Sequence, residues 1–359
     1  MKDTPQRHAP GRASAPEPPP VPEPDPRHTV RLEHGSGGAL SRDLVEKLIY
    51  PLLRSGSFSE LLDAGAVQPG SDFLLTTDGF VVDPPFFPGA DIGKLAVCGT
   101  CNDLAVSGAQ PVALSLALIL EEGFPLEDLR RAMSSAAAAA REAGVNVVTG
   151  DTKVVPRGKG GGLFVTSSGV GRRVFAHPLS PRRIAAGDAV LVSGPVGAHG
   201  LTVLAARESL PVGSSLRSDA ANLYPAVSAL FPLGEGLRFM RDATRGGISA
   251  VLNETVQGSV LGIVIRDDAI PVSPDVRAVC NLLGLNPMEI ANEGVFVAVV
   301  ARGQEEQALE LLRAQPLGRE ACVVGHVSPD CPGRVLATTR VGGTRVVDFP
   351  RGLLLPRIC

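Results

Sequence analysis

The chain has 359 residues, of which 44% are hydrophobic and 20% charged, a composition typical of a globular protein long enough for two domains. Its formal net charge of -3 gives no electrostatic basis for binding nucleic acid or an anionic membrane. No apolar run reaches the roughly 18 residues that a membrane span needs, and residues 1–29 contain no apolar core of a secretory signal. We therefore expect a cytoplasmic protein that binds neither nucleic acid nor membranes.

Residues 1–29 are rich in proline and charge, and they contain few apolar side chains whose burial could offset the entropy of ordering. We predict that this extension is disordered. A glycine run follows it, consisting of His34, Gly35, Ser36, Gly37 and Gly38. Glycines ahead of a helix, here expected over residues 41–53, allow backbone N–H groups to close on phosphate oxygens. A flexible linker has the same composition, and this alternative stays open.

The N-terminal half alternates apolar runs with acids that stand beside glycine or turn residues. Asp63 precedes a strand expected to end at residues 76–77, and Asp78-Gly79 follows directly. The pair Asn102-Asp103 stands just ahead of a Ser-Gly turn, and the apolar run 112–120 predicts a buried strand. Such acids close to strand ends and glycines are suitably placed to hold a hard cation.

A helix and two further strands complete the half. Pro125 begins an alanine-rich helix for which Gly144 is a fitting end. The strand expected over 145–149 leads into the sequence Gly-Asp-Thr-Lys at 150–153, and another strand covers 163–170.

The pair Cys98 and Cys101 forms a CxxC motif, and the chain has no second CxxC or His pair to complete a zinc site. We interpret both as small residues on a buried helix, with a redox role as the alternative. Another cysteine, Cys359, is the final residue.

The composition turns to Pro, Arg and Ser over 176–186, where we place a domain junction. A strand over 187–193 and a helix to about residue 208 follow. Asp242 stands beside glycines at a helix start, and Glu293 lies in an Asn-Glu-Gly turn before the strand 295–300. Interleaved strands and helices predict an α/β (α+β) fold with domains at 30–176 and 177–349, and a mobile tail at 350–359.

Five acids share one kind of position, next to a predicted strand end, a turn or a glycine-marked helix start. They are Asp63, Asp78, Asp103, Asp151 and Asp242. Singly, each is typical of a turn. Together with Lys153 and Glu293 they predict a magnesium–nucleotide site, because each divalent ion takes about six oxygen ligands.

Several motifs in this order resemble the HypE family of hydrogenase maturation proteins, in the superfamily of aminoimidazole ribonucleotide synthetase and selenophosphate synthetase. They are HGSGG, TTDGFVVDPPFFPGADIGKLAVCGT, NDLAVSGAQP, ILEEGFP, VTGDTKVV, LVSGPVGAHG, RDATRGG, NEG and the terminal PRIC. The resemblance covers about residues 30–359. The proline-rich extension and Cys101 depart from it.

The resemblance implies a two-domain fold in which the N-terminal domain forms a β-barrel with a second copy, giving a homodimer, and a C-terminal α/β domain lies beside it. It implies ATP and Mg²⁺ as cofactors, with ATP in the cleft between the domains. A HypF-type carbamoyltransferase would load a carbamoyl group onto Cys359. ATP-dependent dehydration would give a thiocyanate, and a HypC–HypD-type iron complex would receive the cyano group for the [NiFe] hydrogenase centre.

The same motifs imply roles for single residues. Metal contacts would come from Asp63, Asp78, Asp103, Asp151 and Asp242. Nucleotide contacts would come from His34, Gly35, Ser36, Gly37, Gly38, Asp78, Asn102, Asp151 and Thr152. Lys153 and Glu293 would remove protons and position the thiocarbamate of Cys359.

Alternatives to these roles stay open. Lys153 could be a plain phosphate counter-ion, Glu293 a structural bridge, and Cys359 part of a frayed terminus. A sister enzyme that phosphorylates selenide or thiamine monophosphate would share the acids but need no terminal cysteine. A non-catalytic nucleotide-binding scaffold is the other alternative function.

Overall fold

The structure is a computed structural model that describes residues 30–35, 38–53, 61–68, 70–210 and 215–350. Contacts gather the chain from Leu32 onwards into one unit, which is the part considered below. The predicted disordered extension and almost all of the predicted tail lie outside the described residues. Among the helices that the structure describes, none is both long and apolar enough to cross a bilayer.

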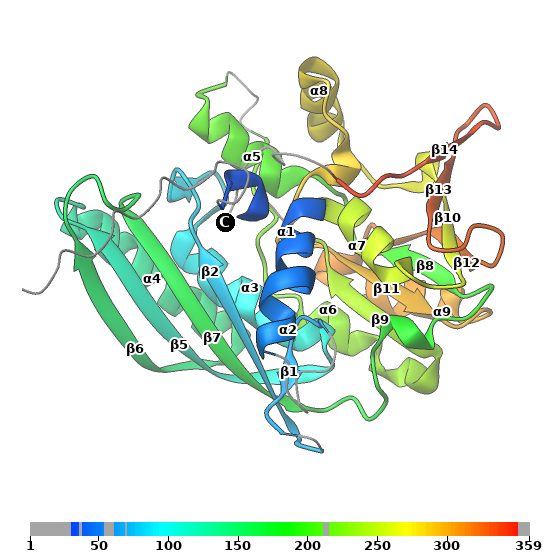
Figure 1. Ribbon diagram of the computed structural model, residues 1–359, viewed down its shortest axis with the longest axis horizontal. Coiled ribbons are helices and arrows are strands. Elements are labelled where there is room, and N and C mark those ends of the chain that lie inside the picture. The colour runs from blue at the N-terminus through cyan, green and yellow to red at the C-terminus, as the bar shows by residue number, and fades with distance from the viewer. Residues whose placement is uncertain (1–29, 36–37, 54–60, 69, 211–214, 351–359) are drawn as a thin grey trace, which may run out of the picture. The chain divides into compact units, whose positions relative to one another are not determined.

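A helical segment begins the described body, close to the predicted span of 41–53. It consists of α1 (Ala39–Leu44), a π-helical stretch (Val45–Ile49) and α2 (Tyr50–Leu53), joined end to end (Figure 1). Gly38 is the N-cap of α1, in an extended conformation. The glycine run therefore leads directly into a helix, as predicted.

A five-stranded sheet forms the centre of the N-terminal half. In spatial order it contains β1 (Gly65–Ala66), β2 (Phe73–Phe80), β7 (Leu163–Arg173), β5 (Ala109–Glu121) and β6 (Asn146–Val155). The pair β5–β6 is parallel and the others are antiparallel. β6 therefore forms one edge of this sheet (Figure 1).

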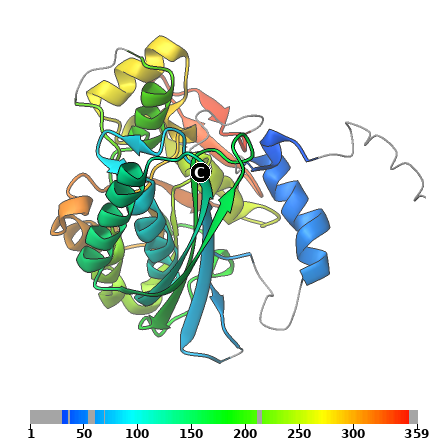
Figure 2. The same cartoon turned by 90° about the vertical axis from the view of Figure 1, so that its left-hand side faces the viewer.

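Two helices, α3 (Ile92–Val106) and α4 (Leu126–Ala143), lie on the same side of these long strands (Figure 2). α3 is buried along almost its whole length. The Asp91 carboxylate caps it, accepting hydrogen bonds from the main chain of Gly93 and Lys94 at 2.8 and 3.0 Å. α4 ends at Gly144, whose φ of 68° is the left-handed conformation that favours glycine. Just ahead of α3 stand the short strands β3 (Phe86–Phe87) and β4 (Ala90–Asp91).

The C-terminal half is built on a seven-stranded sheet in the order β14-β13-β10-β12-β8-β11-β9, antiparallel except for β10–β13. Its strands are β8 (Ala189–Val192), β9 (Leu237–Asp242), β10 (Gly262–Arg266), β11 (Phe296–Val300), β12 (Cys322–Ser328), β13 (Val335–Thr338) and β14 (Thr344–Val346). Its helices are α5 (Ala198–Arg207), α6 (Tyr224–Ala229), α7 (Gly247–Val256), α8 (Pro274–Leu283) and α9 (Glu305–Arg313).

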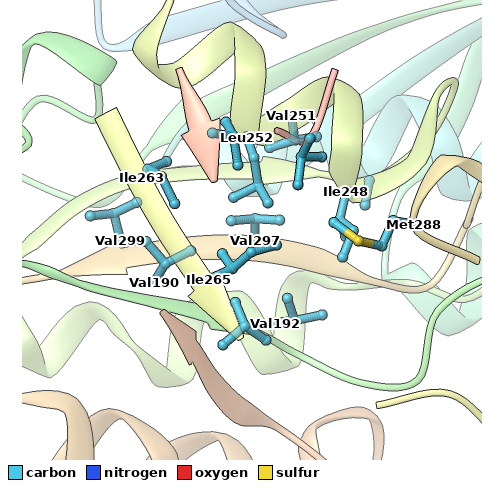
Figure 3. Packing of buried hydrophobic residues seen from close by; sticks show 14 of the residues in the cluster. Val190, Val192, Ile248, Val251, Leu252, Ile263, Ile265, Met288, Val297 and Val299 are labelled. Atoms are coloured by element: carbon cyan, nitrogen blue, oxygen red, sulfur yellow. The ribbon is translucent and has the colours of Figure 1, made fainter. Parts of the chain in front are cut away.

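Helix α7 packs on this sheet through buried apolar side chains. Ile248 and Leu252 lie in one cluster with Val297 and Ile263 of the strands beneath (Figure 3). Burying each such side chain stabilises the fold by about 1.5–3 kcal/mol. This packing fixes the start of α7, and with it the short turn that joins it to Asp242 at the end of β9.

Two acids, Asp151 and Asp78, lie inside strands rather than at the strand ends predicted for them. Asp103 lies in the last turns of α3, just ahead of the predicted Ser-Gly turn, and Asp151 lies in the middle of β6. β6 continues past its glycine because it pairs with β5 as far as Val155. Asp78 likewise lies inside β2, which pairs with β7 as far as Phe80. Pairing with a neighbouring strand, which the local sequence does not reveal, extends both strands.

Candidate active site

Three of the predicted acids converge. Carboxylate oxygens of Asp63, Asp103 and Asp242 all lie within 4.8 Å of one another, and we call these three residues the acid cluster. They come from the loop before β1, from α3 and from the end of β9. The Thr76 hydroxyl lies 2.7 Å from both Asp103 Oδ2 and the Asp63 carbonyl oxygen, which ties α3 to the loop. The acid cluster therefore joins both halves of the chain.

Arg241 orients one member of the cluster. Its Nε donates to Asp63 Oδ1 at 2.7 Å and its Nη1 to Glu254 Oε2 at 2.6 Å. Arg241 is not among the predicted site residues, although it stands next to Asp242 in the RDATRGG motif. The ion pair with Asp63 orients that carboxylate, and the ion pair with Glu254 holds Arg241 in place.

The cluster has the electrostatics of a cation site. Burial raises the pKa of Asp103 and Asp242 well above the ordinary value, and the neighbouring carboxylates raise it further. Burial also raises the pKa of Asp78, which is hydrogen bonded to Asp103. Crowded carboxylates repel one another unless they share protons or a cation, and their oxygens are ligands that Mg²⁺ prefers. The donor set therefore fits Mg²⁺.

We expect Mg²⁺ to stabilise the protein more at pH 8 than at pH 6. Folding raises the pKa values of Asp103 and Asp242 above the ordinary carboxyl value, so the folded state holds protons that the unfolded chain has released. The metal-free protein therefore loses stability as pH rises from the ordinary carboxyl range toward the raised pKa values. Mg²⁺ at a hundredfold excess over its Kd adds about 2.7 kcal/mol, which raises Tm by about 4 °C for a chain of this length. Thermal melts at both pH values, with and without Mg²⁺, measure this.

Asp103→Asn is the matched variant, because it removes one repelled carboxylate and one ligand at nearly constant volume. Its metal-free Tm should be higher and its Mg²⁺ shift smaller. Equal Mg²⁺ shifts at the two pH values, or an undiminished shift in Asp103→Asn, would contradict the assignment.

Glu293 lies beside the acid cluster. It is buried in the turn before β11. Burial is the largest of the effects that raise the pKa of Glu293 well above the ordinary value, and the negative charges of Asp242, Asp219 and Asp78 raise it further. The positive charge of Arg245 lowers this pKa. A carboxyl with a raised pKa is suited to proton transfer, and the predicted catalytic role of Glu293 stays a prediction.

Asn102 connects the two halves. Its Nδ2 donates to the carbonyl oxygens of Ala221 at 3.0 Å and Glu293 at 3.3 Å, and its Oδ1 accepts from the Leu223 N–H at 2.8 Å. These bonds occupy the amide within the protein and hold Glu293 against α3. The predicted direct contact of Asn102 with a nucleotide stays a prediction.

The glycine run reaches the site through Arg245. His34 and Gly35 belong to a short 3-10 helix (Leu32–Gly35), and Arg245 Nη1 donates to the Gly35 carbonyl at 3.4 Å. The Arg245 charge also lowers the pKa of Asp78 against the larger effect of burial. Ser36 and Gly37 lie outside the described residues. Arg245, which also belongs to the RDATRGG motif, is likewise not among the predicted site residues. Its charge is suitably placed for a phosphate.

Asp151, Thr152 and Lys153 are exposed on β6, away from the cluster. Lys153 Nζ lies 2.7 Å from Asp151 Oδ2, and this partner lowers the pKa of Asp151. The sheet register aligns Asp151 with Gly79 across β5 and β7. Three strand spacings amount to about 14 Å. Within one chain these residues are therefore not brought to the acid cluster, and their roles stay predictions.

The CxxC cysteines are buried on α3. Burial raises the pKa of Cys98 and of Cys101 to about 12 each, so both are neutral thiols at physiological pH. Thiolates are the reactive form, and the structural interpretation of this motif is favoured over a redox role.

A cavity of about 790 Å³ adjoins the cluster beneath the N-terminal helical segment. Arg42, Glu46 and Tyr50 line it on one side, and Arg241 and Glu254 on the other. Its volume is in the range of small-molecule sites.

Comparison with models of known protein families identifies the family of each half of the chain. Residues 62–173 match the family "AIR synthase related protein, N-terminal domain" and residues 185–337 match "AIR synthase related protein, C-terminal domain". The fold and its interdomain carboxylates thus define a two-domain protein of the AIR synthase-related class.

Individual relatives with higher sequence identity indicate which family within this class the chain belongs to. Carbamoyl dehydratase HypE of Cupriavidus necator is 45% identical over 335 residues, which span 92% of this chain and 95% of that relative. A crystal structure of a HypE–HypF complex superposes with a TM-score of 0.82 at 41% identity, covering 86% of this chain and 99% of that one. A HypE structure in complex with ATP gives 0.77 at 39% identity, covering 92% and 100%.

The chain belongs to the HypE family of carbamoyl dehydratases. The predicted family, fold class and enzyme class are confirmed.

Proposed function

We propose that this protein uses ATP to dehydrate a carbamoyl group carried on the thiol of Cys359, giving a thiocyanate for the cyanide ligands of a [NiFe] hydrogenase. One observation carries the proposal. Carboxylates from both halves converge beside the glycine run, and the root of the tail lies at the same place, because the Ala39 N–H donates to the Pro350 carbonyl at 3.2 Å. A relative of known structure binds ATP.

The tail root is anchored on α7. Ser249 Oγ donates to the Asp348 carbonyl at 3.2 Å, and Asn253 Nδ2 donates to the Val347 carbonyl at 3.1 Å. From Pro350 onwards, an extended chain advances about 3.3 Å per residue, so the terminal thiol can travel roughly 30 Å. That reach allows Cys359 to meet a donor enzyme outside the protein and to return to the acid cluster.

In the first chemical step, the carbamoyl oxygen attacks the γ-phosphorus of ATP. The O–P bond forms, the bond to the β-phosphate oxygen breaks, and ADP leaves. The carbamoyl nitrogen gives up one proton, so that the product is a phosphorylated imidate still bonded to the cysteine sulfur. Amide oxygen is a poor leaving group, and phosphorylation converts it into a good one.

In the second step, the nitrogen loses its remaining proton and the C–O bond breaks. Inorganic phosphate departs with the former carbamoyl oxygen, and the electron pair completes the C≡N bond. Glu293 is our candidate acceptor for one proton. Lys153 is our candidate for the other, and because it pairs with Asp151 away from the acid cluster of its own chain, it would have to act from a second copy. The net change is thiocarbamate plus ATP to thiocyanate, ADP, phosphate and a proton.

The acid cluster with Asp78 would hold Mg²⁺, which when bound neutralises phosphate charge. Arg245 would bind phosphate oxygens next to the glycine run. The cavity beneath α1 and α2 is the candidate space for the nucleoside. Asp151 and Thr152 lie away from the acid cluster of their own chain, so we propose that they contact the nucleotide from β6 of a second copy.

The reaction requires one partner that supplies the carbamoyl group and another that accepts the cyano group. A HypF-type carbamoyltransferase would load Cys359, and a relative has been solved in complex with HypF. A HypC–HypD-type iron complex would accept the cyano group. Reduced thiols and ATP coexist in the cytoplasm, where we place the reaction. We propose domains at 30–176 and 177–349, with 350–359 as the tail.

We also propose a homodimer formed through the N-terminal sheet. Val148 and Val154 of the edge strand β6 are 67% and 65% exposed, and further apolar side chains on the sheet are exposed too. An uncovered apolar edge strand favours pairing with another chain. A second copy closing the sheet into a barrel would bury these side chains and bring Asp151 and Lys153 into the interface.

Val154→Asp is expected to convert the dimer into a monomer at micromolar concentration, because a charge would then have to be buried at the new interface. Light scattering after size exclusion measures the mass. Val260→Asp, at an 81% exposed site of the C-terminal half, is the control and should stay dimeric. A Val154→Asp protein that remains a dimer would rule out this interface.

The proposed reaction itself is tested by the mass of the C-terminal peptide before and after ATP is added. A carbamoylated peptide should lose one water in the presence of ATP.

A further inference from the structure

We propose that Asp219 is a positioning residue that fixes the main chain at Glu293 and so aims the Glu293 carboxylate at the acid cluster. This inference rests on the proposed dehydration, in which Glu293 takes a proton.

The central contact is a hydrogen bond to the backbone. The Glu293 N–H donates to Asp219 Oδ1 at 3.1 Å. A Cβ on Gly294 would lie 2.0 Å from the Asp219 carbonyl oxygen. The two main chains therefore pass closer than any residue with a side chain at position 294 permits, and this proximity lets the short Asp219 side chain reach the N–H.

Other hydrogen bonds fix the main chain on both sides of the Glu293 N–H, and the bond to Asp219 fixes the N–H itself. Asn102 donates to the Glu293 carbonyl at 3.3 Å. Asn292 Oδ1 accepts from the Gly197 N–H at 2.7 Å, and its Nδ2 donates to the Ala243 carbonyl at 2.9 Å. The residue before Glu293 and the Glu293 carbonyl are thus fixed by amides, and the Glu293 N–H by Asp219.

The Asp219 segment is itself held from two sides. Ser218 Oγ bonds the buried His199 Nδ1 at 2.8 Å and accepts from the Ala220 N–H at 3.1 Å. The Ser218 N–H donates to the Pro88 carbonyl at 2.9 Å, and the His199 ring contacts Phe87 edge-on, with centroids 5.4 Å apart. Asp219 therefore sits on a segment that both halves of the protein fix.

The second carboxylate oxygen of Asp219, Oδ2, indicates that this residue does more than fill space in the core. Asp219 Oδ2 is buried and makes no hydrogen bond of good geometry among the described residues, although the backbone N–H groups of Gly294 and His199 lower the pKa of the carboxyl against the larger effect of burial. Burying a carboxylate oxygen without a partner costs stability. A neutral apolar residue at this position would avoid that cost but would leave the Glu293 N–H unbonded and the turn free to shift. Misplacing a reacting group by about 1 Å can lower a rate about a hundredfold.

The test is single-turnover dehydration of protein already carbamoylated on Cys359, at saturating ATP. Asp219→Ala should lower the rate about a hundredfold while the Kd for ATP changes less than threefold. Asp219→Asn, which keeps an oxygen for the Glu293 N–H, should restore the rate to within tenfold of wild type. Asp275→Ala, at an exposed first-turn position of α8, is the control and should match wild type.

A double-mutant cycle separates positioning from a general loss of structure. In a Glu293→Gln background, Asp219→Ala should lower the residual rate no further, because the group that it positions is already gone. If Asp219→Ala does not fold, Asp219→Ser, too short to reach the N–H, replaces it in the same cycle. A single-variant rate within threefold of wild type, or a fully additive loss in the cycle, would overturn the role of Asp219. Absence of any dehydration by the wild-type protein would instead contradict the proposed function.

Discussion

Asp103→Asn is expected to lower ATP-dependent dehydration by about a thousandfold, the order of loss seen when one preorganised electrostatic group is removed from a reacting phosphoryl or acyl centre. Asp103 is the member of the acid cluster that α3 supplies, within 4.8 Å of the Asp63 and Asp242 oxygens. Asparagine keeps the volume and can still bond the Thr76 hydroxyl, which lies 2.7 Å from the carboxylate. The fold should therefore persist while the negative charge that binds the cation is lost.

The measurement is phosphate release from carbamoylated protein at saturating ATP, repeated over a Mg²⁺ titration. Asp275→Asn, an exposed acid in the first turn of α8, is the matched control and should keep the wild-type rate. If Asp103→Asn retains more than a tenth of the wild-type rate at every Mg²⁺ concentration, the acid cluster is not the catalytic metal site.

Cys359→Ser is expected to abolish acceptance of the carbamoyl group and all ATP turnover that depends on it. The nucleophile is a thiolate, and an unperturbed cysteine has a pKa of about 8.5, whereas a serine hydroxyl stays protonated at neutral pH. Other cysteines cannot replace it. Burial raises the pKa of Cys322 to about 11, and Cys98 and Cys101 are buried within α3.

Transfer of label from a carbamoyl donor to the protein measures this loss. Cys322→Ser is the control, because serine can keep the hydrogen bond that the Cys322 thiol makes to the Ala269 carbonyl at 3.1 Å. A sister enzyme that phosphorylates a small molecule would keep its turnover without Cys359. Undiminished labelling or turnover in Cys359→Ser would therefore contradict the tail mechanism and favour such an enzyme.

Local signals in the sequence predicted much of the fold. Pro125 precedes α4, and Gly144 ends it in the left-handed conformation, as the sequence predicts. Asp242 stands just ahead of a glycine-marked helix start, as predicted. Each of these depends on residues close together in the chain, where propensity and capping act directly.

Features that depend on long-range contacts were not predictable in the same way. The strand length of β6 depends on pairing with β5, so Asp151 was expected at a strand end and lies mid-strand. Asp63 and its partner Arg241 are 178 residues apart, and nothing near Arg241 indicates an ion pair. Asp219 has no adjacent glycine motif, and its role arises from a close approach to Gly294 that only the packed chain shows.

The central claim is tested most directly by mass spectrometry of the C-terminal peptide. The protein is carbamoylated by a HypF-type donor, the donor is removed, and half of the sample then receives Mg-ATP. We predict that the peptide containing Cys359 carries the mass of a carbamoyl group in both halves and loses one water only in the half that receives ATP. A carbamoylated peptide that keeps its mass with Mg-ATP, or loses water equally without it, would contradict the account.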